Sequence, residues 1–292
     1  MSAARSARGV PPPLPARRPD SHKGDYGRIL IVAGSRDLSG AAALCAMGAL
    51  RAGAGLVRVA LPDAVHPALC ARVLAATWLP LPSTHAGTLA HESYRALRRA
   101  ASEADAVALG PGLGGHVETA RLVRELALEI EKPLVLDADG LNAFAGRVDE
   151  LQRKQPTVLT PHPGEFARLC PRRAVKTPAQ RLAAARALAR DIRGVVVLKG
   201  HGTVVADARS AYVNTTGNPG MATGGSGDVL AGMTAALLVT SEGALLAARR
   251  AVYAHGLAGD LARDALGETS LGAEDLLSYL GPAFLRWQNP DR

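Results

Sequence analysis

Aromatic residues are scarce in this chain of 292 residues: Phe, Trp and Tyr together make up 3%, against 48% hydrophobic residues overall. A core with so few large rings must be filled by Ala, Leu and Val. The basic residues are dispersed along expected helices and are not interleaved with aromatic ones, which argues against a nucleic-acid partner. The net charge of +8 reflects either a compositional bias toward Arg or attraction to anionic small molecules. We favour the bias.

Long apolar runs and paired cysteines are also missing. The longest apolar run, 229–239, has eleven residues, well short of the roughly 20 that a membrane span needs. The three cysteines, Cys45, Cys70 and Cys170, form no CxxC pair and are typical of small buried residues in a reducing cytosol. We therefore expect a cytoplasmic protein without a membrane partner.

Two common nucleotide-binding motifs are absent. No GxxxxGK[ST] segment occurs, and GPGLGG at 110–115 lacks the spacing of a dinucleotide-binding fingerprint. Alone, this loop indicates a tight turn after a strand. It could also let backbone amides approach a ligand, because glycine has no Cβ.

Short apolar strands alternate with longer helical stretches along most of the chain. The alternation predicts an α/β fold, with a mostly parallel central sheet and helices on both faces. Several short strands after 195 predict hairpin additions at one sheet edge. We expect strands at 28–34, 55–61, 104–110, 133–138, 156–160 and 195–200, and helices at 39–54, 117–131, 178–193, 228–240, 243–264 and 272–280.

The sequence predicts one domain and a tail. Residues 1–22 are rich in Pro and Arg and predict a disordered tail, with a weak transit-peptide character as the alternative. No linker interrupts the pattern afterwards, so 23–292 is expected to be a single catalytic domain.

The loops that follow the predicted strands are unusually rich in Gly, Pro and Asp. In open α/β sheets, ligands bind beyond the carboxyl ends of the strands. Five such loops on one rim predict a long cleft for an extended polar ligand; they read GSRDLSGAA, GPGLGG, DADGLN, TPHPGEF and KGHGT.

Individual side chains in these loops allow two interpretations each. His162 between two prolines is either structural or in contact with substrate, and Glu165 could cap the next helix. Asp137 and Asp139 are two residues apart at a strand end and should face opposite ways, so a shared proton or metal is not implied; for Asp139 we favour an N-cap. Lys199 is either a surface charge or a contact to a nucleotide phosphate.

The segment NPGMATGGSGDVLAG, 218–232, predicts an anion hole. Gly224, Gly225, Ser226 and Gly227 can turn backbone N–H groups toward one point, and a helix N-terminus behind them adds positive charge. Asp228 in that field should prefer its ionised form and accept a proton from a hydroxyl. The alternative is a glycine-rich loop in which Asp228 only caps the helix.

This segment resembles the anion-hole motif of the ribokinase-like superfamily. With HKGDYGRILIVAGS, SGAA, GPGLG, TPHPGEF and LKGHGT, residues 22–280 are similar to ADP-dependent NAD(P)H-hydrate dehydratases. The resemblance implies a ribokinase-like three-layer sandwich and a repair enzyme. In that family ADP phosphorylates the C6 hydroxyl of the S epimer of hydrated NADH or NADPH, and loss of phosphate restores the double bond and leaves AMP and phosphate.

The resemblance also implies roles for particular residues. Asp228 would be the base and would contact the hydrate, together with Ala41 or Ala42, Gly112 and His162. The nucleotide would be held by Lys199, Gly200, His201, Gly202, Thr203 and Gly227. Mg²⁺ is expected to arrive with ADP, without dedicated protein ligands. A homo-oligomer is expected, and a separate epimerase would supply the S form.

Two other functions remain open from the sequence. An ATP-dependent kinase of a vitamin precursor or sugar would use the same anion hole and Asp228, but would yield a stable phosphorylated product. A regulator that binds nucleotide without turnover is the third interpretation, and the intact GGSGD segment argues against it.

Overall fold

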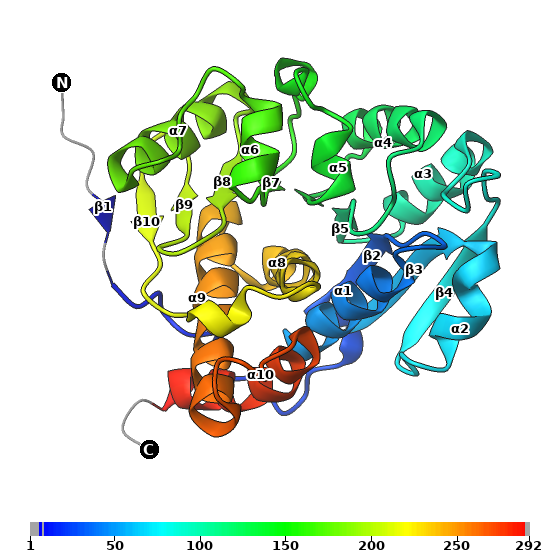
Figure 1. Cartoon of the computed structure of the whole chain (residues 1–292). Helices are drawn as coiled ribbons and strands as arrows, with labels where there is room; N and C mark the ends of the chain where they lie inside the picture. Colours follow the sequence, from blue (N-terminus) through cyan, green and yellow to red (C-terminus); the bar gives the residue numbers. More distant parts are fainter. Residues whose placement is uncertain (1–5, 8, 290–292) are drawn as a thin grey trace.

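The computed structural model describes residues 6–7 and 9–289, and within them one sheet lies between two layers of helices (Figure 1). The strand order is β1-β10-β9-β8-β7-β6-β5-β2-β3-β4. Strands β2 to β8 pair in parallel, and β9 pairs antiparallel with both β8 and β10, as the expected hairpin additions require. The strands are β1 (Ser6–Ala7), β2 (Arg28–Val32), β3 (Leu56–Pro62), β4 (Ala76–Leu81), β5 (Ala106–Leu109), β6 (Leu134–Leu136), β7 (Thr157–Leu159), β8 (Val195–Leu198), β9 (Val204–Ala206) and β10 (Ala211–Val213).

Successive strand residues divide the core into two halves. Ile29 and Ile31 of β2 pack in the cluster that contains the helices at 39–51, 226–240, 244–266 and 273–288, whereas Leu30 and Val32 pack with the helices between 94 and 191. This follows from the two-residue period of a strand, which turns neighbouring side chains to opposite faces. Because both faces are covered, the central strands β5, β6 and β8 are apolar throughout.

The helices complete the predicted three-layer arrangement, which is confirmed. No helix in the described part of the chain is long and apolar enough to cross a membrane. The helices are α1 (Ser39–Arg51), α2 (His66–Cys70), α3 (Tyr94–Ser102), α4 (Val117–Glu129), α5 (Asp139–Asn142), α6 (Pro163–Leu169), α7 (Pro178–Asp191), α8 (Ser226–Thr240), α9 (Ala244–Leu266) and α10 (Ala273–Gln288).

Several elements differ from the sequence prediction, among them α2 and α3, which were not predicted. Strand β4 was not predicted; it lies at the sheet edge, and its Pro80 breaks the usual strand pattern. Helix α10 was expected to end near 280, but it continues through Pro282 to Gln288. Ala283 and Trp287 beyond the proline are buried in the core, and this packing outweighs the cost of proline inside a helix.

The prediction of a disordered tail at 1–22 is corrected for residues 9–22, while 1–5 and 8 lie outside the described residues. Trp287 Nε1 donates to the Pro11 carbonyl at 3.0 Å, and the Arg250 guanidinium donates to the carbonyls of Pro12 and Pro13 at 2.9 and 3.0 Å. Trp287 and Arg250 are buried, and a buried donor without a partner is costly. The proline-rich segment supplies the acceptors they need.

Helices α1 and α8 pack unusually closely. A Cβ on Gly232 of α8 would lie 1.9 Å from the Cys45 carbonyl oxygen, and one on Gly48 of α1 would lie 2.4 Å from that of Val229. No side chain fits in either place, so glycine is required for this approach. The crossing seats the start of α8 against the sheet, at the rim where the strands end.

Candidate active site

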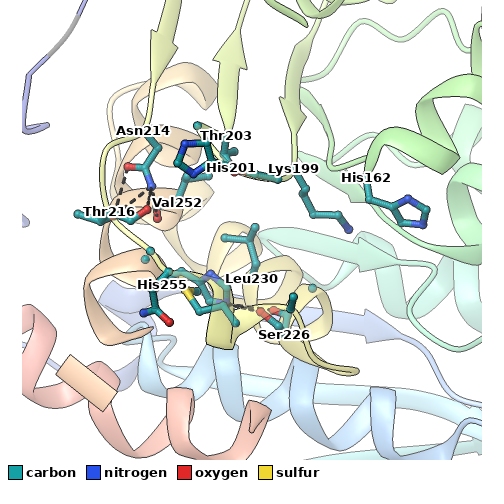
Figure 2. Close-up of a pocket in the computed structure, with 18 of the residues that line it drawn as sticks. His162, Lys199, His201, Thr203, Asn214, Thr216, Ser226, Leu230, Val252 and His255 are labelled. Atoms are coloured by element: carbon teal, nitrogen blue, oxygen red, sulfur yellow. Dashed lines mark hydrogen bonds between the residues drawn. The ribbon is translucent and has the colours of Figure 1, made fainter. Parts of the chain in front are cut away.

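Of the five rim loops predicted from the sequence, those after β2 and β5 take no part in the cavity lining, and the other three meet at the carboxyl ends of β6, β7 and β8. They line a cavity of about 1010 Å³ with the start of α8, the segment 213–223 after β10, and one face of α9. Figure 2 shows Lys199, His162, Ser226 and His255 around this cavity. Its volume suits a ligand larger than a sugar.

A buried ion pair forms the floor of the cavity. Lys199 Nζ lies 2.8 Å from Asp137 Oδ1 and 3.7 Å from Glu165 Oε2. Asp137 and Glu165 are 1% and 5% exposed, and Thr160 Oγ1 also donates to Asp137 Oδ1, at 2.6 Å. Burial lowers the pKa of Lys199, but the attraction of Asp137 and Glu165 outweighs it and raises the pKa overall. Lys199 is therefore an ammonium that faces the cavity, not a free surface charge.

Asp228 is the third residue of α8 and lines the same cavity. Burial raises its pKa to about 7, and repulsion from Asp137 adds to this, while Lys199 acts in the opposite direction. The prediction that its surroundings make Asp228 prefer its ionised form is therefore wrong. The positive end of α8 is outweighed by burial and by neighbouring carboxylates that the sequence does not place nearby. A carboxyl with this pKa exchanges a proton near neutral pH, as a catalytic base must.

His162 caps helix α6, and Glu165 completes the cap. His162 Nδ1 accepts from the N–H groups of Gly164 and Glu165 at 3.0 and 3.3 Å, and Glu165 Oε2 accepts from the His162 N–H at 2.7 Å. Because Nδ1 is an acceptor, the neutral ring carries its proton on Nε2. His162 thus has the structural role foreseen for it. Its half-exposed ring also lines the cavity, with Nε2 3.4 Å from Glu165 Oε1.

The glycine-rich start of α8 approaches Lys199 closely. A Cβ on Gly227 would lie 3.2 Å from Lys199 Nζ, and Gly225 has a φ of +89°, which favours glycine. Gly225, Ser226 and Gly227 line the cavity, whereas Gly224 is not part of its lining. The first N–H groups of a helix lack intrahelical partners, so N–H groups and an ammonium converge here.

The segment 199–203 also lines the cavity throughout. Gly200 and Gly202 have φ values of +125° and +62°, and the Thr203 hydroxyl donates to the Gly200 carbonyl at 2.8 Å. Arg181 donates to the carbonyls of Leu198 and Lys199 at 3.0 and 3.1 Å. These contacts hold a tight loop that exposes backbone to a ligand.

Gly112 and Ala41 lie together on the rim but outside the cavity lining. A Cβ on Gly112 would lie 2.7 Å from Ala41 Cβ. Ala42 is fully buried in the core, so of the two alanines named from the sequence only Ala41 stands where a ligand could touch it. Asp139 is not the N-cap that we favoured; it is the first residue of α5 and accepts from the Gly114 N–H at 2.8 Å.

Sequence reasoning missed several lining residues. Asp137 was considered only as half of a carboxylate pair, and His255 was not considered at all. Burial lowers the pKa of His255 to about 4, so the ring is neutral and its Nε2 lies 3.0 Å from the Ser226 carbonyl oxygen. This bond ties α9 to the start of α8. A lone histidine within the small-residue segment 254–259 was the available signal.

The side chains of the described residues do not form a metal site by themselves. Within residues 6–7 and 9–289, no three His, Cys, Asp or Glu side chains are grouped to hold a metal ion. Two of the carboxylates, Asp137 and Glu165, already face Lys199. These residues do not fit a resident metal site of their own.

Comparison with known proteins decides the family. The model of the NAD(P)H-hydrate dehydratase family matches residues 29–281. The chain belongs to this family. The resemblance of the anion-hole and rim motifs to NAD(P)H-hydrate dehydratases is thereby confirmed.

Individual relatives agree with this family assignment. A bifunctional NAD(P)H-hydrate repair enzyme from Thermofilum pendens is 46% identical over 94% of this chain and 52% of its own length; the chain thus spans about half of the curated relatives it matches. The ADP/ATP-dependent NAD(P)H-hydrate dehydratase of Bacillus subtilis, co-crystallized with ATP/Mg²⁺, has a TM-score of 0.80 and 33% identity, covering 94% of this chain and 95% of that one. A ribokinase-like superfamily protein from Enterococcus faecalis has a TM-score of 0.78 and 27% identity, with coverages of 94% and 93%.

Proposed function

We propose that this protein repairs damaged nicotinamide nucleotides, converting the S epimer of NADH hydrate or NADPH hydrate to NADH or NADPH at the expense of ADP. The observation that carries the proposal is the position of Asp228. Its carboxyl, with a pKa of about 7, sits in the first turn of α8 and shares one large cavity with Lys199 and the 199–203 loop. Family membership supplies the substrate class.

The proposed reaction has two steps. Asp228 accepts the proton of the C6 hydroxyl while that oxygen bonds to the terminal phosphorus of ADP, and the bond from this phosphorus to the bridging oxygen breaks to release AMP. The phosphate then leaves C6 with its bonding electrons, and C5 loses a proton to solvent water, which restores the C5–C6 double bond. The Lys199 ammonium and the N–H groups of Gly225, Ser226 and Gly227 would stabilise the charge on the transferred phosphoryl group.

The binding roles follow the cavity lining. The loop of Lys199, Gly200, His201, Gly202 and Thr203 would hold the nucleotide, and Gly227 would contact its phosphates. Ala41, Gly112 and the Nε2 donor of His162 would lie along the hydrate. Mg²⁺ would be carried by the nucleotide phosphates, consistent with the ATP/Mg²⁺ of the Bacillus subtilis relative.

The donor, the source of the substrate and the assembly extend the proposal. ADP is the proposed donor, although the Bacillus subtilis relative is named for both ADP and ATP. An epimerase would supply the S form; the curated relatives are named bifunctional repair enzymes. A cytoplasmic location and a homo-oligomer stay predictions.

The test follows the near-ultraviolet absorbance of reduced nicotinamide when the protein meets NADH hydrate, magnesium and ADP or ATP. ADP should restore the absorbance and release free phosphate, and Asp228→Asn should lower the rate by roughly 10³-fold because the base is lost. Asp149→Asn, which alters an exposed carboxylate outside the cavity, should not change it.

Other outcomes have distinct meanings. Recovery with ATP alone would keep the reaction and overturn the choice of donor. If neither nucleotide restores the absorbance, the dehydratase proposal fails, and a stable phosphorylated product from a vitamin precursor or sugar would favour the kinase alternative.

A further inference from the structure

Asp228 shares the cavity with several charged side chains. The carboxylates of Asp137, Asp139 and Glu165, near the ends of β6 and β7, repel its negative charge, and within the described residues Lys199 is the cation that acts on it. A Cβ on Gly227, the neighbour of Asp228, would lie 3.2 Å from Lys199 Nζ and 3.9 Å from Asp137 Oδ2, so both charges lie beside the first turn of α8. Cys45 on α1 is buried, and burial together with repulsion from Asp228 and Asp137 raises the pKa of its thiol. Three negative groups thus oppose one positive group around the proposed base.

The cation in this set is held in one place. Asp137 Oδ1 and Glu165 Oε2 lie on Lys199 Nζ at 2.8 and 3.7 Å, and Gly227 leaves room for the ammonium beside the first turn of α8. Asp137 is itself held, because its Oδ1 accepts from Thr160 and its backbone N–H donates to the Leu109 carbonyl at 3.2 Å. Glu165 is held by the α6 cap.

We propose that Asp137 and Glu165 are positioning residues, which fix the Lys199 ammonium beside the start of α8 and repel negative charge on Asp228. They touch neither substrate nor the reacting atoms in this proposal; they act through Lys199 and Asp228. The consequence of this positioning for the reaction rests on the function proposed above.

Lys199 and the two acids shift the protonation of Asp228 in opposite directions, so their effects can be measured separately. Lys199 stabilises the carboxylate form, whereas Asp137 and Glu165 stabilise the protonated form. Near neutral pH the balance leaves Asp228 free to take the hydroxyl proton and to release it before the next turnover. Without the two acids, Lys199 would hold Asp228 as a weaker base.

The experiment measures kcat against pH for wild type and three variants, Asp137→Asn, Glu165→Gln and Lys199→Met, with Asp149→Asn as the control. The acid limb of the wild-type profile should lie near the pKa of Asp228, about 7. It should move toward lower pH by about one pH unit in Asp137→Asn, and less in Glu165→Gln, because a repelling charge is lost. In Lys199→Met it should move toward higher pH. Asn at 137 keeps an acceptor for Thr160 and Lys199, and Asp149→Asn should leave the limb in place.

A second readout does not depend on turnover. Infrared difference titration of the protonated carboxyl band, assigned by its loss in Asp228→Asn, gives the pKa of Asp228 in each folded variant. Opposite displacements in Asp137→Asn and Lys199→Met support the proposal. If both variants lose activity equally at all pH values and the Asp228 band titrates as in wild type, Asp137 is merely structural and the proposal is overturned. If wild type shows no dehydration but the band moves as expected, the proposed function has failed and the positioning role stands.

Discussion

Asp228 is expected to reduce the stability of the folded chain at alkaline pH. Its pKa rises from 3.8 to about 7 on folding, so between these values the folded chain binds more protons than the unfolded chain. Stability therefore falls as pH rises through this window and stays reduced above it. Asp228→Asn should raise the free energy of unfolding by roughly 3 kcal/mol at about pH 8, and the gain should shrink toward pH 5.

Urea unfolding of both proteins at the two pH values measures this difference. The pKa of His255 falls to about 4 on folding, so His255 lowers the stability of the folded chain as the pH drops below the pKa of an unfolded histidine. This effect is the same in both proteins and cancels in the difference between their free energies of unfolding. Asp149→Asn is the matched control, since its carboxylate is exposed. If the gain in the free energy of unfolding does not depend on pH, folding does not raise the pKa of Asp228.

At the scale of elements, a strained turn separates β6 from α5. Ala138 has a φ of +49° and a ψ of −119°, and the Gly140 N–H donates to the Asp137 carbonyl at 2.9 Å. This is the geometry of a type II′ turn, whose first central position favours glycine. The turn carries Asp137 to Lys199 and Asp139 to the loop at Gly114, and Ala138 itself lines the cavity.

Replacing Ala138 by glycine should relieve this strain. We expect Ala138→Gly to raise the free energy of unfolding by about 1 kcal/mol, because the relief exceeds the entropy cost of glycine. Ala90→Gly, at an ordinary φ of −76°, should instead destabilise the chain. Thermal unfolding measures the stability of both variants. A loss of stability in Ala138→Gly would show that the backbone at Ala138 is not strained.

At the scale of the whole molecule, the N-terminal segment ties distant parts of the chain together. It bonds to Arg250 and Trp287, which lie 237–238 and 276 residues further along, and β1 pairs with β10 at the sheet edge. Arg250 is on α9, the helix that brings Val252 and His255 to the cavity. The segment therefore supports the layer on which the proposed site is built.

Trp287→Phe should cost about 1–2 kcal/mol of unfolding free energy, because the Pro11 carbonyl loses its donor while most of the buried ring remains. Trp78 on β4 is the matched control, since no hydrogen bond from its indole nitrogen occurs within the described residues. Trp78→Phe should change stability less, as followed by circular dichroism in urea. Equal losses in both variants would show that the bond to Pro11 does not stabilise the fold.

The sequence alone determined the layered α/β fold and the rim where the site lies. Strand and helix periods are local properties, and parallel strands place their carboxyl-end loops on one side. Thus His162, Lys199 and Asp228 were named from short segments, and their family followed from the motifs that contain them.

Only the tertiary structure decided the charge state of the site and the course of the tail. Lys199 meets Asp137 across 62 residues, and the pKa of Asp228 depends on burial and on carboxylates from other loops. The proline-rich segment is ordered by donors near the other end of the chain. Burial and electrostatic interactions depend on distance in space, which folding sets and which the spacing of residues along the chain does not contain.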